Sequence, residues 1–197
     1  MIQFRDYQQK IIDDGVKIIS EKGFLYLAME VRTGKTLTSL GIAEKMGYEN
    51  VLFLTKKKAI SSITHDNDMM CPTSFILFVI NYESMHKLPN IKWDLIILDE
   101  AHGMGAFPKP NKRAKDVRTI ISKTGCDVCL LSGTPTPESY SQMYHQVYGI
   151  PKNPFRQYPS FYKFSHDYVD VKEKKINSMY IRDYTRGHDS IIQKMKP

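Results

Sequence analysis

The stretch FLYLAMEVRTGKTLTS, residues 24–39, decides the fold of this 197-residue chain. It begins with an apolar run typical of a buried strand, passes through a loop that ends in Gly-Lys-Thr, and continues with helical spacing. A phosphate-binding loop needs backbone N–H groups turned toward an anion, a helix N-terminus behind them and a nearby cation. The stretch offers all three, although Met29 stands where the pattern G-x-x-x-x-G-K-[ST] has its first glycine.

Gly-Lys-Thr also arises by chance in front of an amphipathic helix, so the loop alone does not decide the function. If it binds a nucleotide, Gly34 permits close approach of the phosphates and Lys35 reaches the β- and γ-phosphates. The Thr36 hydroxyl then contacts Mg²⁺, and Arg32 and Thr33 complete the loop.

Short apolar strands alternate with helices over the first 150 residues. Strands are expected at 24–29, 51–55, 75–80, 93–98 and 126–132, and helices at 3–22, 36–46, 113–123 and 138–147, with a further helical piece ending near residue 69. This alternation predicts an α/β fold, with a mainly parallel sheet covered by helices on both faces. Ligands bind at the carboxyl ends of such strands. VRTGKT, DEAH (99–102) and SGTPTP (132–137) all follow strands, so we expect them at one edge.

The segment LIILDEAH, residues 95–102, ends a buried strand with two adjacent carboxylates. Burying charge there is costly unless a cation or a proton transfer uses it. We expect Asp99 to hold Mg²⁺ and Glu100 to position and deprotonate an attacking water. The alternative is a solvated strand end or an N-cap for the next segment.

Together, VRTGKT and DEAH resemble the first motor domain of superfamily-two helicases and translocases, over roughly residues 4–150. Glycine-poor loops are frequent in that family. The resemblance implies a RecA-like P-loop NTPase domain that hydrolyses ATP with Mg²⁺. It implies catalysis by Glu100 and Lys35, and ATP binding by the loop from Arg32 to Thr36.

Weaker motifs extend the resemblance. FRDYQ (4–8) resembles the family's adenine-recognition motif and assigns Gln8 to the base, although an exposed helix start is an alternative. LTKKKAI (54–60) stands in the place of motif Ia, which grips the nucleic-acid backbone, although a solvated loop is the commoner meaning of such a run. The resemblance to motif Ia implies nucleic-acid contacts by Thr55, Lys56, Lys57 and Lys58.

Two further segments point to the Swi/Snf-like branch, which tracks along double-stranded DNA. NYES (81–84) looks like the aromatic segment before the Walker B strand and adds Tyr82 to the nucleic-acid contacts. SGTPTP resembles motif III, which implies coupling of hydrolysis to movement by Ser132 and Thr134, with His102 on the DEAH side. The branch usually follows motif II with a basic residue and Lys-Asn, whereas GMGAFPKPNKR follows here. The expected partner is DNA, double-stranded in this branch, and the compact chain is compatible with a phage-borne source.

Family motors hold ATP between two RecA-like domains, and the second domain supplies an arginine finger worth about 10³–10⁵ in rate. No Q-x-x-G-R-x-x-R element follows residue 137. We therefore expect residues 1–150 to form the first domain, and the basic, aromatic residues 151–197 to lead toward a second RecA-like domain in the full protein or in a partner chain. The isolated chain is expected to bind ATP weakly and to hydrolyse it very slowly.

The composition agrees with an anionic partner. The net charge is +7 with a pI near 9.2, which favours nucleic acid, nucleotide or a membrane surface. The start MIQFRDYQQK lacks the apolar stretch of a signal peptide, and the apolar runs fall far below the ~20 residues of a membrane span. Three cysteines, an odd number, favour a reduced compartment. The expectation is a soluble cytoplasmic or nucleoid-associated protein with no membrane partner.

Two other functions stay open. One is a nucleic-acid-binding or regulatory module that keeps the fold without an ATPase, which salt-sensitive DNA binding indifferent to ATP would indicate. The other is the motor part of a restriction system. A small-molecule P-loop kinase is disfavoured, because it would leave DEAH and SGTP without a role.

Overall fold

The chain divides into two compact units in its computed structural model, which describes residues 3–176 and 179–196. Unit 1 comprises Met1–Glu100 and Thr119–Gly133, and unit 2 comprises Ala101–Arg118 and Thr134–Pro197. The helix α4 (Lys112–Thr124) begins in unit 2 and ends in unit 1.

Unit 1 is built on a five-stranded, wholly parallel sheet with the strand order β1-β5-β4-β2-β3. The strands are β1 (Phe24–Ala28), β2 (Asn50–Thr55), β3 (Ile76–Asn81), β4 (Leu95–Leu98) and β5 (Asp127–Ser132). Each strand was expected from the sequence to within one or two residues. The predicted α/β fold with a parallel sheet is therefore confirmed.

The three inner strands of the sheet are buried almost throughout. Leu52, Phe53, Ile97 and Leu130 have no exposed surface, because helices and loops cover both faces of a parallel sheet. Cys129 lies in the same layer, and burial raises the pKa of its thiol to about 12. The described residues contain no group of three or more His, Cys, Asp or Glu side chains placed to hold a metal.

The helices that belong wholly to unit 1 are α1 (Asp6–Lys22), α2 (Lys35–Met46) and α3 (Ile60–Met70), with two short 3-10 turns, η1 (Lys57–Ala59) and η2 (Tyr82–Lys87). In the described part of the chain, no helix combines the length and the apolar character that a membrane crossing requires.

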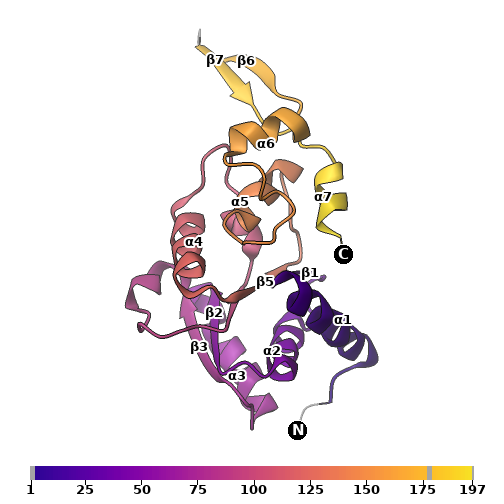
Figure 1. The fold of residues 1–197 in the computed structure, drawn as a ribbon, viewed down its shortest axis with the longest axis vertical. Helices are drawn as coiled ribbons and strands as arrows, with labels where there is room; N and C mark the ends of the chain where they lie inside the picture. Colours follow the sequence, from indigo (N-terminus) through magenta and orange to yellow (C-terminus); the bar gives the residue numbers. More distant parts are fainter. Residues whose placement is uncertain (1–2, 177–178, 197) are drawn as a thin grey trace. The chain divides into compact units, whose positions relative to one another are not determined.

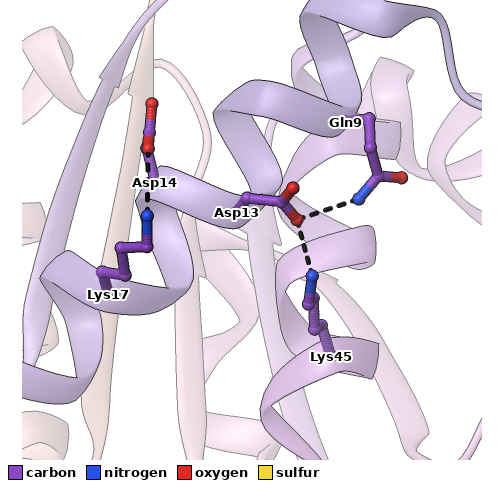
Figure 2. A network of polar contacts seen from close by, with 5 residues as sticks. All are labelled: Gln9, Asp13, Asp14, Lys17 and Lys45. Carbon is purple, nitrogen blue, oxygen red and sulfur yellow. Dashed lines mark hydrogen bonds and ion pairs between the residues drawn. The ribbon is translucent and has the colours of Figure 1, made fainter.

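Helices α1 and α2 lie side by side (Figure 1), and two glycines allow this approach. A Cβ at Gly15 would lie 2.7 Å from the Ile42 Cδ1 atom, and a Cβ at Gly41 would lie 2.6 Å from the Ile12 Cδ1 atom. A polar network closes the exposed side of the same contact (Figure 2). Within it, Asp13 of α1 accepts hydrogen bonds from Lys45 of α2 at 2.6 Å and from Gln9 at 2.9 Å. The middle of α1 is thereby tied to the last turn of α2.

Unit 2 contains the helices and turns η3 (Ala101–Met104), η4 (Tyr140–Gln142), α5 (Met143–Val147), α6 (Phe161–Tyr168) and α7 (Ser190–Met195), and a hairpin of β6 (Lys172–Ile176) and β7 (Met179–Asp183). Its core is aromatic, with Tyr144, Phe155, Phe161 and Phe164 almost fully buried. Their rings meet at tilted or edge-to-face angles, for example 4.9 Å between the Tyr144 and Phe164 centroids. Such pairs favour packing beyond the area that they bury.

Candidate functional site

The loop between β1 and α2 has the geometry of an anion-binding turn. Gly34 precedes the first residue of α2 with a φ of 80°, so that the free N–H groups of the helix start face the loop. The Lys35 Nζ atom donates hydrogen bonds to the carbonyl oxygens of Met29 and Glu30, at 3.0 and 2.9 Å. The lysine therefore lies across its own loop, and the Thr33 hydroxyl ties the loop further by donating to the Glu30 carbonyl at 2.6 Å.

Helix α1 delivers Gln8 to this loop. Gln8 is buried, and its Oε1 atom accepts the Arg5 backbone N–H at 3.0 Å. Its amide nitrogen packs against Gly34, where any Cβ would overlap it. The Tyr7 hydroxyl donates to the Thr33 carbonyl oxygen at 3.0 Å, a second tie between α1 and the loop. The first turn of α1 and the loop thus form one contiguous surface.

Asp99 follows β4 and is held by three groups. The Thr55 hydroxyl donates to the Asp99 Oδ2 atom at 2.7 Å, and the Glu100 backbone N–H donates to the Oδ1 atom at 3.0 Å. The Tyr82 hydroxyl donates to the Asp99 backbone carbonyl at 2.6 Å. The carboxylate therefore has a fixed direction while each oxygen keeps a further lone pair for a ligand.

Glu100 has a φ of 51°, in the left-handed region that costs a residue with a side chain about 1–2 kcal/mol. Near it lies Tyr26 of β1, whose hydroxyl hydrogen-bonds the Ser132 side chain. Burial raises the pKa of Tyr26 far above its usual range, the Glu100 carboxylate adds to the rise, and the bond with Ser132 opposes it. Tyr26 and Ser132 thus belong to the surroundings of Glu100.

The loop after β1 and the two carboxylates after β4 lie at the same edge of the sheet. β1 and β4 both pair with β5, so their carboxyl ends lie about 10 Å apart. Gly133, just after β5, fills the space between, since a Cβ there would meet the Val31 side chain at 3.3 Å. Gln8, the loop, Asp99, Glu100 and Ser132 therefore lie together at the carboxyl edge of unit 1.

The two other residues predicted to couple hydrolysis to movement, His102 and Thr134, belong to unit 2. His102 lies in η3, which is tied to the segment after SGTPTP. Gly105 packs directly on Gln142, and the Gln146 amide donates to the Pro135 carbonyl at 2.8 Å while lying against Gly105. Within unit 2, the segment that follows DEAH therefore contacts η4 and α5, and α5 is bonded to Pro135 of SGTPTP.

The residues predicted to contact nucleic acid separate into two groups. Lys56, Lys57 and Lys58 are exposed after the carboxyl end of β2. Thr55 and Tyr82 are buried, at 0% and 3% exposure, and their hydroxyl groups are engaged with Asp99. The structure thus presents three lysines on the surface and directs the other two side chains to the carboxylate site.

Sequence reasoning missed Tyr7, Tyr26 and Gln146. Tyr26 carried a signal, because a tyrosine two residues before the end of an apolar strand places its hydroxyl near the strand's carboxyl end. Tyr7 and Gln146 act through contacts with backbone carbonyls that are distant in sequence, and no local pattern marks such contacts.

Comparisons with known proteins concern the family and the fold. The model of the SNF2-related domain family matches residues 42–182. The model of a second family, described as the res subunit of Type III restriction enzymes, matches residues 1–75.

Among solved structures, the SWI2/SNF2 ATPase core of Sulfolobus solfataricus in complex with dsDNA matches with a TM-score of 0.68 at 17% identity, over 85% of this chain and 39% of that chain. The SWI2/SNF2 ATPase core domain from the same organism gives 0.63 at 14% identity, over 85% and 38% of the two chains. A nuclease-deletion mutant of the Type ISP restriction-modification enzyme LlaGI, in complex with a DNA substrate mimic, gives 0.51 at 19% identity, over 68% and 18%. At these identities the likeness concerns the fold, and the chain spans only 39% of the length of the first structure.

Proposed function

This chain belongs to the SNF2-related domain family, and we propose that it is the ATP-binding first motor domain of an ATP-dependent DNA translocase or helicase. The family and the fold are those of ATPase- and helicase-type enzymes. The observation that carries the proposal is the convergence of the loop, Asp99 and Glu100 at one sheet edge.

In this proposal the residues of the loop bind the phosphates. The N–H groups at the start of α2 face them, and the helix dipole favours their negative charge. Lys35 exchanges its two bonds to the loop carbonyls for the β- and γ-phosphates, and Arg32 and Thr33 bind the nucleotide beside it. The Thr33 hydroxyl also ties the loop through the Glu30 carbonyl. Gln8 contacts the adenine through its side-chain amide, which the Arg5 N–H orients by donating to the Oε1 atom.

Glu100 orients the attacking water and accepts its proton. Its left-handed backbone aims the side chain, and the Asp99 carboxylate fixes that backbone through the Glu100 N–H. Tyr26 and Ser132 line the same place, so that a change at Glu100 reaches the start of SGTPTP. His102 and Thr134 are proposed to pass the change on within unit 2, through η3 and η4.

The donors present suit Mg²⁺. This cation takes oxygen ligands and is usually held by one or two carboxylates together with substrate phosphates. Asp99 and the Thr36 hydroxyl are such donors, and the Thr55 hydroxyl keeps the Asp99 carboxylate in a fixed direction. When bound, the ion neutralises charge on the β- and γ-phosphates.

DNA is the proposed nucleic acid along which the motor moves. The net charge of +7 and the exposed Lys56, Lys57 and Lys58 favour a polyanion. The SWI2/SNF2 core that shares the fold was solved with dsDNA, which supports a duplex. A second RecA-like domain, beyond residues 151–197 or in a partner chain, is proposed to supply the arginine finger.

The test is ATP turnover by the purified chain, with and without duplex DNA, beside nucleotide binding. Glu100→Gln is expected to keep binding and abolish turnover. Lys35→Ala is expected to weaken nucleotide binding at least tenfold, because a hydrogen bond to a charged group contributes about 1.5–3 kcal/mol.

The outcomes separate the candidate functions. Binding without turnover in the wild type would mean that a second domain completes the site. Turnover that survives Glu100→Gln would refute the role of Glu100. Salt-sensitive DNA binding by a chain that binds no nucleotide would replace the motor by a binding or regulatory module.

The motor of a restriction system is a second candidate, favoured by the match of residues 1–75 to the Type III res subunit. It uses the same site, so the turnover experiment does not separate the two. A search for a nuclease or methyltransferase that copurifies with the native protein would separate them. Translocation by a native protein without either partner would count against restriction.

A further inference from the structure

The β6–β7 hairpin of unit 2 has no role in the nucleotide site. It extends beyond α6 (Figure 1), and side chains are exposed on both of its faces. Met179, Tyr180 and Ile181 are 66%, 72% and 46% exposed. Successive residues of a strand face opposite sides, so Tyr180 lies on one face of the hairpin and Met179 and Ile181 lie on the other. A two-stranded hairpin alone is marginally stable in water, and exposed apolar side chains on it indicate a contact with another molecule.

The base of the hairpin is firmly attached. Tyr184, directly after β7, is buried against Phe161 with ring centroids 5.4 Å apart, and its carbonyl accepts the Ser141 hydroxyl at 2.7 Å. Gly187 packs so closely on η4 that a Cβ there would lie 2.6 Å from the Ser141 backbone nitrogen. The hairpin is therefore held in a fixed direction by the segment that follows SGTPTP.

One face of the hairpin combines an aromatic ring with cations. Lys175 is directly opposite Tyr180 in the antiparallel register, and its ammonium lies 5.9 Å from the ring centroid. Arg182 projects from the same face two residues further along β7, opposite Glu173 at 3.8 Å. The two strands together carry four basic side chains and two acidic ones, at 172–176 and 179–183.

We propose that this face, formed by Lys175, Tyr180 and Arg182, is a nucleic-acid contact, with the two cations on backbone phosphates and the Tyr180 ring against a base or sugar. A two-stranded ribbon fits the major groove of a duplex, and an exposed aromatic ring flanked by cations suits a single strand. The inference rests on the proposed function, and it adds a DNA-contacting element that lies outside the sequence motifs. A partner protein is the competing occupant, and the excess of basic side chains favours the polyanion.

The experiment measures anisotropy of a labelled 30-base-pair duplex and of the matching single strand with the full chain, over a range of salt concentrations. Tyr180→Ala is paired with Tyr162→Ala, which removes another exposed tyrosine of unit 2. Lys175→Ala/Arg182→Ala is paired with Lys10→Ala/Lys17→Ala, which removes the same charge from the exposed side of α1.

Tyr180→Ala is expected to weaken binding about tenfold, more for the single strand if a base stacks and more for the duplex if the ribbon enters a groove. The double charge variant should lower the slope of log affinity against log salt by about 2. The paired controls should leave both quantities unchanged, and all variants should melt with the wild type because the replaced side chains are exposed.

The failures are distinguishable. If the wild type binds DNA and the hairpin variants bind equally well, the hairpin contact is refuted, a protein occupant is favoured, and the proposed motor stands. Equal losses in the control variants would refute the site as well. If the wild type binds neither DNA, both this inference and the DNA track fail, while nucleotide binding still tests the ATP site.

Discussion

Replacing Gly34 by alanine tests the junction between α1 and the loop. The added Cβ meets two obstacles. Gly34 has a φ of 80°, where a side chain is strained, and the Cβ would overlap the Gln8 amide nitrogen. Gly47 at the end of α2 has a φ of 69° and open space around the position of a Cβ. Gly47→Ala therefore carries the strain without the overlap.

The magnitudes follow from these two terms. Left-handed backbone costs an alanine about 1–2 kcal/mol, and both variants bear this cost. Gly34→Ala also displaces Gln8 from the Arg5 N–H, a bond worth about 0.5–1.5 kcal/mol. We expect losses in the free energy of unfolding of about 1–2 kcal/mol for Gly47→Ala and about 1.5–3.5 kcal/mol for Gly34→Ala.

The assay is urea unfolding of both single variants, of Gln8→Ala, and of Gly34→Ala combined with Gln8→Ala. The combined variant should lose less than the sum of its two single changes, by about 0.5–1.5 kcal/mol, because the overlap disappears with the glutamine. Binding of a fluorescent ATP analogue should weaken with Gly34→Ala and stay unchanged with Gly47→Ala. Equal losses for the two glycine variants, together with strict additivity, would refute the contact of Gln8 with the loop.

Three further outcomes are expected. Tyr82→Phe removes the donor to the Asp99 carbonyl and should lower the free energy of unfolding by about 0.5–1.5 kcal/mol. Tyr162→Phe should leave this free energy unchanged, and equal losses in the two variants would contradict a stabilising bond from Tyr82. Burial lowers the pKa of His145. The stabilisation that the neutral imidazole contributes is therefore complete above pH ~6.5 and is lost as the pH falls below that value. Melting temperatures from pH 5 to 8 should decline less toward acid pH in His145→Gln than in the wild type, and parallel curves for the two proteins would contradict this. Gly41→Ala places a Cβ 2.6 Å from a methyl group of α1 and should lower the free energy of unfolding by about 1–3 kcal/mol, measured with urea. An unchanged midpoint of unfolding would contradict the close contact of the two helices.

The architecture of unit 1 could be predicted because its signals are local. Apolar runs such as LIIL, bounded by polar residues, mark strands, and Gly23 and Gly47 stop α1 and α2. The expected helix over 3–22 begins at Asp6 because Arg5 is extended and donates its N–H to Gln8. Nothing comparable marks residues 151–197, where the sequence shows scattered aromatics and prolines. The described part of this segment packs through ring contacts such as Phe155 with Phe164, which no periodicity reveals.

The candidate site was predictable where chemistry and chain order coincide. Lys35, Asp99 and Glu100 follow strands, so their placement at one edge followed from the parallel sheet. The orientation of Thr55 and Tyr82 did not follow. Strand ends look alike in sequence whether a side chain turns to solvent or inward, and here both hydroxyl groups turn to Asp99. We therefore propose that these two residues position the carboxylate, and that Lys56, Lys57 and Lys58 carry the contact with DNA.

Backbone strain points to the same place without any motif. Among the described residues, Arg32 and Glu100 are the non-glycine positions with positive φ. Such conformations cost about 1–3 kcal/mol each and persist where the surroundings enforce them. Here the surroundings are visible: Lys35 and Thr33 bind the loop carbonyls beside Arg32, and the Asp99 carboxylate holds the Glu100 N–H. Positive φ at both positions supports the proposal of a nucleotide site at this edge.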